Sequence, residues 1–169
     1  MVITMFNDAE KHDIFDYFRP KCASNDLYSY GEQGEQQAKL ILEQAGFQLQ
    51  PHDKINNHYD FKWRNNRKLE IKKNLKNNTV VIELTDKNKL GWYYQYIDKT
   101  TDNRPDDIGF LSKDGKQLYI ITINDLQQLV ENNNYEHFYS FGDCIRIPLL
   151  DITLCASSEI YFLKEKAGK

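Results

Sequence analysis

The chain of 169 residues has a formal net charge of −3 at pH 7, and 40% of its residues are hydrophobic. This length suits one well-buried core and is short for two, so we expect a single domain over residues 1–169. No stretch approaches the ~20 apolar residues of a membrane span, and the start of the chain lacks the basic residues and apolar run of a signal peptide, so we expect a cytoplasmic protein without a membrane partner.

The first predicted element is a short helix over residues 9–19. Asn7 and Asp8 can cap its start, and Pro20 closes its end. Residues 21–30 are polar and carry no period, which indicates a loop before the next helix.

A second and stronger helix is predicted over residues 31–45. It has an apolar stripe that includes Ala38, and Gly46 stands at its C-terminal stop. At 100° per residue, Glu35 falls about 60° from Ala38 and Glu32 about 120° away on the polar side. Glu35 therefore lies at the edge of the buried face, where it is either a residue of the first turn or an acid directed into a site.

Four strands are predicted after this helix, divided by asparagine-rich turns. Aromatic residues alternate with polar ones in residues 59–63, and aliphatic residues alternate with charged ones in residues 68–72. Each of these two strands therefore has one apolar and one charged face. The four strands are expected at residues 47–50, 59–64, 68–73 and 79–84.

The alternation predicts how the second and third strands pair. Residues directly opposite in an antiparallel pair share a face, so Trp63 should meet Leu69 and Phe61 should meet Ile71 around the loop 65–67. A two-residue loop at the asparagines, a common hairpin signal, would place charged side chains against the core. We therefore expect the three-residue loop.

In this predicted register Asp60 lies opposite Lys72. Asp60 and Glu70 then become diagonal neighbours roughly 7 Å apart at the backbone. Two carboxylates at that distance can bind one cation between them.

The rest of the chain predicts further strands and one helix. The aromatic run 92–96 is helical or irregular, and Lys113-Asp114-Gly115 form a turn between two strands. Asn124-Asp125 cap a helix that reaches about Asn132. The strands are expected at residues 108–111 and 118–123, with edge strands at 144–152 and 160–163.

Basic residues gather around the acids. From Lys62 to Lys76 there are seven basic residues and one acid, Glu70. A polyanion would be drawn to that segment although the whole chain is slightly acidic; the alternative is an ordinary solvated hairpin. The candidate nucleic-acid-binding residues are Lys62, Arg64, Arg67, Lys68, Lys73 and Lys76.

The order of a helix acid, a strand acid, and then an acid and a lysine on the next strand resembles the PD-(D/E)XK nuclease superfamily, in its resolvase-like or phage endonuclease-like branch. The resemblance covers residues 31–84, and it implies an α/β restriction-endonuclease-like core, a mixed β-sheet flanked by helices. Tyr59 stands where the namesake proline would be, and Gln95-Tyr96 does not reproduce the Q-x-x-x-Y spacing of the RecB-like group. The matching residues are Glu35, Asp60, Glu70 and Lys72.

These residues also predict a metal centre. Asp60 and Glu70, with the Ile71 carbonyl, would coordinate Mg²⁺ or Mn²⁺, and Glu35 would bind directly or through water. Ligands that are all oxygens disfavour zinc. Lys72 would orient or deprotonate the attacking water and offset charge in the transition state.

The main hypothesis from the sequence is a Mg²⁺-dependent deoxyribonuclease. The resolvase-like helix favours an endonuclease for branched DNA such as a Holliday junction, where symmetric cleavage would require a homodimer. Metal chemistry at phosphate is indifferent to the sugar, so RNA cleavage stays an alternative. The other alternative is a nuclease-fold module that binds nucleic acid or protein without activity, which the acidic net charge and the aromatic run favour.

Several weaker candidates have ordinary structural explanations beside the functional ones. Glu83 is either an outer acid of the site or a solvated strand residue. His52 and His58 can contact phosphate, although a lone loop histidine is more often structural. The aromatics of residues 92–96 can stack on splayed bases or belong to the core.

Overall fold

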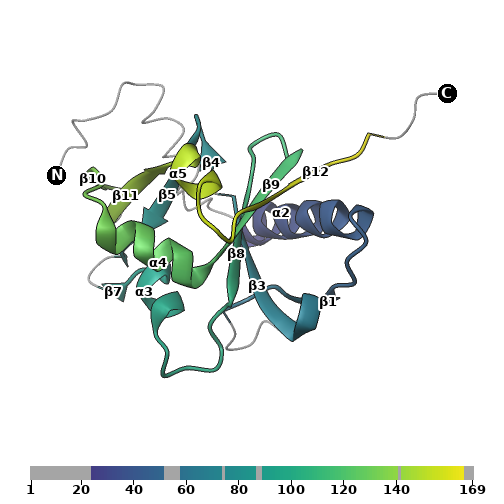
Figure 1. The fold of residues 1–169 in the computed structure, drawn as a ribbon, viewed down its shortest axis with the longest axis horizontal. Coiled ribbons are helices and arrows are strands. Elements are labelled where there is room, and N and C mark those ends of the chain that lie inside the picture. Colours follow the sequence, from purple (N-terminus) through teal and green to yellow (C-terminus); the bar gives the residue numbers. More distant parts are fainter. Residues whose placement is uncertain (1–23, 52–57, 74, 87–88, 141, 166–169) are drawn as a thin grey trace.

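A computed structural model describes residues 24–51, 58–73, 75–86, 89–140 and 142–165 of the chain. Over these residues the protein is a mixed α/β structure with a six-stranded mixed sheet, smaller sheets and a few helices (Figure 1). The helix predicted at residues 9–19 lies outside the described residues, as does His52. No helix within the described ranges is long and apolar enough to cross a membrane.

The six-stranded sheet has the order β1-β2-β3-β8-β9-β12. In this sheet β3 and β8 pair in parallel, and the other neighbours pair antiparallel. A parallel pair needs a long crossover, and the chain between these two strands forms part of a second sheet and a helix. The strands are β1 (Gln50–Pro51), β2 (Phe61–Trp63), β3 (Arg67–Lys72), β8 (Asp107–Leu111), β9 (Gln117–Thr122) and β12 (Glu159–Phe162).

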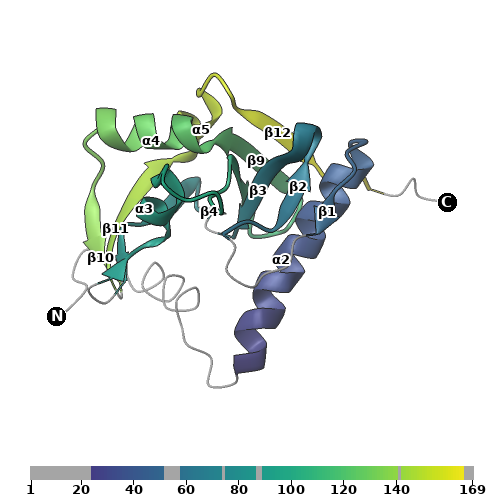
Figure 2. The same cartoon turned by 90° about the horizontal axis from the view of Figure 1, so that it is seen from below.

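Helix α2 (Ser24–Gln44) covers one face of this sheet (Figure 2). Ala38, Ile41 and Leu42 are fully buried there and share a core with Leu69 of β3, so the predicted apolar stripe is confirmed. The helix begins at Ser24 rather than at the expected Gly31. Its first turns carry no apolar period, which is why the sequence pattern does not show them.

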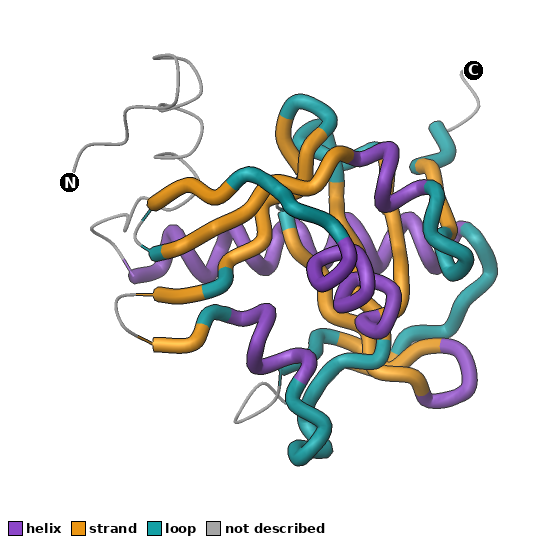
Figure 3. The backbone as a smooth tube through the Cα atoms, turned by 60° about the vertical axis from the view of Figure 1, so that its left-hand side comes forward, coloured by secondary structure: helices purple, strands orange, loops and turns teal. Residues whose placement is uncertain are grey.

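The opposite face of the sheet packs against a second group of strands and three helices (Figures 2 and 3). Phe110 of β8 and Ile121 of β9 are fully buried in this second core. The four-stranded sheet has the order β10-β11-β5-β4, and β6 and β7 form a separate pair. The elements are β4 (Leu75–Lys76), β5 (Thr79–Glu83), β6 (Thr85–Asp86), β7 (Lys89–Leu90), β10 (His137–Tyr139), β11 (Asp143–Pro148), α3 (Trp92–Ile97), α4 (Ile123–Asn132) and α5 (Leu149–Thr153).

The C-terminal strands differ in part from the prediction. β12 lies at the edge of its sheet, as expected. β11, however, lies between β10 and β5 and ends at Pro148, where the chain turns into α5. Proline has no N–H for the ladder, so it closes this interior strand rather than marking an edge.

The predicted hairpin and helix in the middle of the chain are confirmed with small shifts. β8 and β9 pair with Leu111 opposite Leu118, and α4 ends at Asn132. The cap of α4 is Thr122 rather than Asn124-Asp125, because the Thr122 side chain accepts a hydrogen bond from the Asp125 N–H at 3.1 Å.

The register of β2 and β3 corrects the predicted pairing. Phe61 lies opposite Leu69, not Ile71, and Trp63 lies opposite Arg67. The loop is therefore 64–66, and Asn65 and Asn66 adopt the left-handed conformation with φ of 53° and 58°. Asparagine tolerates that conformation, so the turn closes earlier than expected. The shift is two residues, which leaves every side chain on its predicted face.

Candidate active site

Asp60 lies directly before β2 and is held against β3 by two hydrogen bonds. Its N–H donates to the Leu69 carbonyl at 2.9 Å, and its Oδ2 accepts from the Ile71 N–H at 2.8 Å. The two partners, Leu69 and Ile71, are the residues directly before and after Glu70. Asp60 is thus level with Glu70 rather than opposite Lys72, so the two acids are closer neighbours than the predicted diagonal arrangement makes them.

Glu70 is the most enclosed acid of the site. It is 8% exposed, and its Oε1 accepts hydrogen bonds from the Tyr96 hydroxyl at 2.9 Å and from the Lys72 ammonium at 2.7 Å. The Lys72 Nζ also lies 5.3 Å from the Tyr96 ring centroid and 5.5 Å from that of Trp92. Two aromatic rings of helix α3 thus lie beside the Lys72 ammonium, and such contacts stabilise a cation.

Glu35 approaches the same place from α2. Its side chain is half-buried whereas Glu32 is exposed, as the helical phase predicts. Its charge acts on Asp60 and raises the pKa of that carboxyl. The structure therefore brings together the three acids and the lysine that the sequence singles out.

Burial and the neighbouring acids together change the ionisation of Asp60. Burial, then Glu70, then Glu35 raise the pKa of Asp60 to about 8, against the opposing effects of the Ile71 N–H and Lys72. A carboxyl with that pKa is largely protonated at neutral pH. Lys72 lowers the pKa of Asp60 less than burial and the two neighbouring acids raise it.

The surroundings of Lys72 favour its charged form. Burial lowers its pKa, but Glu70 and Tyr96 together raise the pKa well above its usual value. Lys72 is therefore a cation at neutral pH. This geometry supports the part of the prediction in which Lys72 orients water and offsets charge, and it does not supply the neutral amine that deprotonation would need.

The donors of this site suit a hard cation. Within the described part of the chain, no group of three or more His, Cys, Asp or Glu is arranged to hold a metal ion. Mg²⁺ nevertheless needs only one or two carboxylates, because it keeps several waters. Asp60 and Glu70 can supply these carboxylates, and a divalent cation beside Asp60 would restore its ionised form. The chemistry of Asp60 and Glu70 therefore suits Mg²⁺ or Mn²⁺.

The two predicted DNA-binding arginines hold the hairpin to the sheet. Arg67 donates to Asp107 at 2.8 and 2.7 Å, and Asp107 is 1% exposed. Arg64 lies 4.1 Å from the Trp63 ring centroid and pairs with Glu159. Both guanidiniums are thus engaged within the fold.

The four predicted DNA-binding lysines are distributed over several elements. Lys68 contacts the Asp102 carbonyl, and Lys62, Lys73 and Lys76 are half-buried on β2, after β3 and on β4. Whether they bind nucleic acid stays a prediction.

Tyr96 belongs to the aromatic run that the sequence suggests for base stacking or the core, and its contact with Glu70 was not predicted. It shares a helix face with Trp92, and their ring centroids are 5.3 Å apart. The helix can lie here because Gly91 has no side chain: a Cβ on Gly91 would be 2.5 Å from the Glu83 carbonyl oxygen. The aromatic run was visible in the sequence, but its contact with Glu70 depends on this close approach.

The other weak candidates lie around α3. Glu83 accepts a hydrogen bond from the Trp92 N–H at the start of the helix, and burial followed by Asp86 raises its pKa. Glu83 thus supports the helix that contacts the site. The exposed His58 ring lies 6.0 Å from the Tyr96 ring, centroid to centroid.

Comparison of the chain with protein-family profiles, curated proteins and solved structures finds no match. The likeness to the PD-(D/E)XK superfamily therefore rests on the motif residues of 31–84. The function has to be inferred from the geometry of the acids and Lys72.

Proposed function

We propose that this protein is a Mg²⁺-dependent endonuclease that hydrolyses phosphodiester bonds in DNA on a restriction-endonuclease-like core. The observation that carries the proposal is the meeting of three acids and one lysine from α2, the start of β2, and β3. Burial and the neighbouring acids raise the pKa of Asp60, and a bound cation would restore its ionised form. Carboxyls with strongly shifted pKa values cluster at functional sites.

Each residue of the site would have a distinct role in hydrolysis. Asp60 and Glu70 would hold the metal with the Ile71 carbonyl, and Glu35 would contact a metal-bound water. Bound Mg²⁺ supplies an activated water and positive charge at the scissile phosphate. Lys72, which is 21% exposed and protonated, orients the attacking water and stabilises the negative charge of the transition state. Tyr96 fixes the orientation of Glu70 through its hydroxyl.

A second candidate is a nucleic-acid-binding module of the same core without activity. The observation that favours it is the pairing of Glu70 with Lys72 at 2.7 Å, because that lysine occupies an oxygen that the metal would use. The two arginines engaged within the fold also leave less positive charge for DNA.

A cleavage assay tests the proposal. Labelled duplex, nicked, single-stranded and four-way-junction DNA, and a matched RNA, are incubated with the protein in Mg²⁺, Mn²⁺ or EDTA. We expect metal-dependent internal cuts in DNA. Asp60→Asn keeps an oxygen for the Ile71 N–H and removes the charge, so it should abolish cleavage without unfolding the protein. Symmetric cuts in the junction would indicate a two-fold dimer.

The matched control is Glu136→Gln, which neutralises an exposed acid outside the site. It should cut as the wild type does. Binding of DNA without cleavage in either metal would favour the inactive module, and cutting of RNA in preference to DNA would reassign the substrate.

A further inference from the structure

Strand β12 forms one edge of the six-stranded sheet, and within the described residues it pairs with β9 alone. It has four residues, whereas the other edge strands of the two larger sheets have two (β1 and β4) or three (β10). At the opposite edge of the same sheet, β1 contains Pro51, a residue that protects an edge because it has no N–H. β12 has no proline, so its outward backbone groups can bond to another strand.

The hydrogen bonds between β12 and β9 identify these outward groups. The Leu163 N–H donates to the carbonyl of Lys116, the residue directly before β9, at 2.8 Å. In an antiparallel pair, residues that bond to the neighbouring strand alternate with residues that do not. Tyr161 therefore also bonds toward β9. The N–H and carbonyl groups of Ile160 and Phe162 point the other way, out of the sheet.

The side chains of the same two residues are apolar and exposed. Ile160 is 41% exposed and Phe162 is 59% exposed, whereas Tyr161 lies on the opposite face and packs on the core beneath α2. Edge strands that stay unpaired commonly carry charged side chains instead. Exposed apolar residues that gather in one place are typical of an interaction surface. Of the eight exposed large hydrophobic residues in the described ranges, four lie in residues 150–162: Leu150, Leu154, Ile160 and Phe162.

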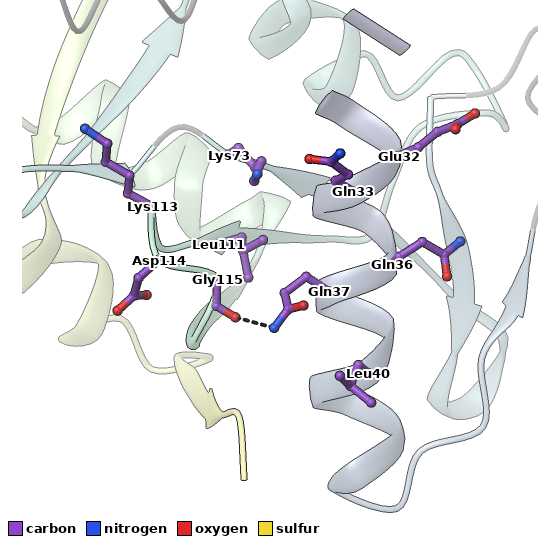
Figure 4. A pocket seen from close by; sticks show the side chains of 10 residues that line it. All are labelled: Glu32, Gln33, Gln36, Gln37, Leu40, Lys73, Leu111, Lys113, Asp114 and Gly115. Carbon is purple, nitrogen blue, oxygen red and sulfur yellow. Dashed lines mark hydrogen bonds between the residues drawn. The ribbon is translucent and has the colours of Figure 1, made fainter. Parts of the chain in front are cut away.

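The C-terminal end of β12 is held to the rest of the fold. Next to Lys116, the turn that joins β8 to β9 is tied to α2, because the Gln37 Nε2 donates to the Gly115 carbonyl at 2.9 Å (Figure 4). The Lys164 N–H, directly beyond this end of the strand, donates to the Gln44 Oε1 of α2 at 2.9 Å. β12 is thus fixed in place before it meets a partner, and a preorganised strand loses less conformational entropy on association.

We propose that β12 pairs antiparallel with β12 of a second copy of this chain and joins the two six-stranded sheets into one. A two-fold axis perpendicular to the sheet keeps every side chain on its own face, so a residue of the apolar face must lie opposite another residue of that face. With Tyr161 on the axis, Ile160 lies opposite Phe162 of the partner subunit. All the outward N–H and carbonyl groups of these two residues then bond across the pair. The edge is therefore self-complementary, and this property identifies a second copy as the occupant.

Analytical ultracentrifugation of the full chain tests the association. A pair of short strands buries less area than a typical stable interface, so we expect a weak dimer whose population rises with protein concentration. Sedimentation velocity over about a 100-fold range of concentrations should show a shift from monomer to dimer. A monomer at every concentration would overturn the proposal. The measurement needs neither metal nor nucleic acid, so its outcome is independent of the proposed nuclease function.

Two double variants test the register of the pair. In I160K/F162K the introduced lysines face each other across the strand pair, whereas in I160K/F162E each introduced lysine faces an introduced glutamate. Both variants remove the same apolar side chains, so only the charge pairing differs between them. We expect I160K/F162K to dimerise about tenfold more weakly than I160K/F162E, because like charges directly opposite destabilise a pair and opposite charges stabilise it. Equal dimerisation of the two variants would contradict this register.

The matched control is Tyr139→Lys, which places a charge at an exposed position of β10, the edge strand of the other sheet. It should dimerise as the wild type does, and a loss of dimer in this variant would overturn the assignment of the interface to β12. Circular dichroism of each variant checks that it is folded.

Amide hydrogen exchange, followed by NMR, locates the contact in the wild type. The N–H groups of Ile160 and Phe162 should exchange more slowly as the protein concentration rises, because they become bonded only in the dimer. The Tyr161 N–H already bonds toward β9 and should change little. Exchange of Ile160 and Phe162 that is independent of concentration, in a sample that dimerises, would show that the interface lies elsewhere.

Discussion

The two ends of β3 carry ionic clusters of opposite design. At its start, Arg67 donates two hydrogen bonds to the buried Asp107, and the Trp63 indole N–H donates a third at 2.9 Å. Arg67 and Asp107 carry opposite charges, and the Asp107 carboxylate accepts all three bonds. This cluster links β2, β3 and β8.

At the other end of β3 an acid has other acids as neighbours. Glu70 shares its oxygen between Lys72 and Tyr96, while burial, then Glu70, then Glu35 raise the pKa of Asp60. The comparison teaches that a carboxylate bonded to a cation links strands, whereas a buried carboxyl beside other acids has a raised pKa and belongs to the candidate catalytic centre. The following predictions test that difference.

The largest expected effect is on cleavage when one acid of the candidate active site is neutralised. Asp60→Asn should lower kcat/KM by about 10³-fold or more, since the metal loses a ligand. The same change should leave the thermal midpoint equal or raise it, because it removes a carboxyl whose ionised form burial and the neighbouring acids disfavour. Calorimetry and single-turnover cleavage measure both. A lower midpoint together with lost activity would mean that Asp60 is structural.

The corresponding change in the balanced cluster should act on stability. Asp107→Asn leaves Arg67 without a counter-charge and should lower the free energy of unfolding by about 2–3 kcal/mol, less than for a fully buried pair because Arg67 is partly exposed. Urea denaturation gives the value. Cleavage per folded molecule should stay close to wild type. A loss of cleavage as large as that of Asp60→Asn would contradict the proposed difference between the two clusters.

The two clusters should also differ in pH dependence. In metal-free protein the pKa of Asp60 is about 8, above the ~3.9 of an unfolded aspartate. Between these values the folded state holds one proton more, so the free energy of unfolding falls as pH rises, by at most about 1.4 kcal/mol per unit. Denaturation in EDTA at pH 5, 6.5 and 8 should show this fall in the wild type and in Asp107→Asn, and not in Asp60→Asn. Parallel curves of unfolding free energy against pH for the wild type and both variants would contradict the assignment of this fall to Asp60.

The smallest expected effect concerns Tyr96. Tyr96→Phe removes the hydroxyl that donates to Glu70 and should lower kcat and Mg²⁺ affinity by about tenfold. Tyr94→Phe changes an exposed tyrosine of the same helix and is the matched control. Equal activity of the two variants would show that the hydrogen bond does not position Glu70.

Local periodicity predicted which face each residue occupies. The period of two in the strands put Asp60, Glu70 and Lys72 on one face, and helical phase selected Glu35 over Glu32. Both rules depend only on residues that are close in the chain. They therefore stay valid although the predicted register of β2 and β3 was wrong by two residues.

The parts that the sequence could not predict depend on distant contacts. The pairing of β2 with β3 shifted by two residues because Asn65 and Asn66 take the left-handed conformation and Arg67 joins Asp107, forty positions away in the chain. The place of Tyr96 depends on the approach of Gly91 to Glu83. Neither contact leaves a local pattern.

The most direct test of the central claim is a crystal structure of the protein with Mn²⁺, recorded at a wavelength where manganese scatters anomalously. We expect one strong peak at about 2.2 Å from oxygens of both Asp60 and Glu70, and its loss in Asp60→Asn. A wild-type structure with no peak there in saturating Mn²⁺, and with Glu70 still paired to Lys72, would contradict the account.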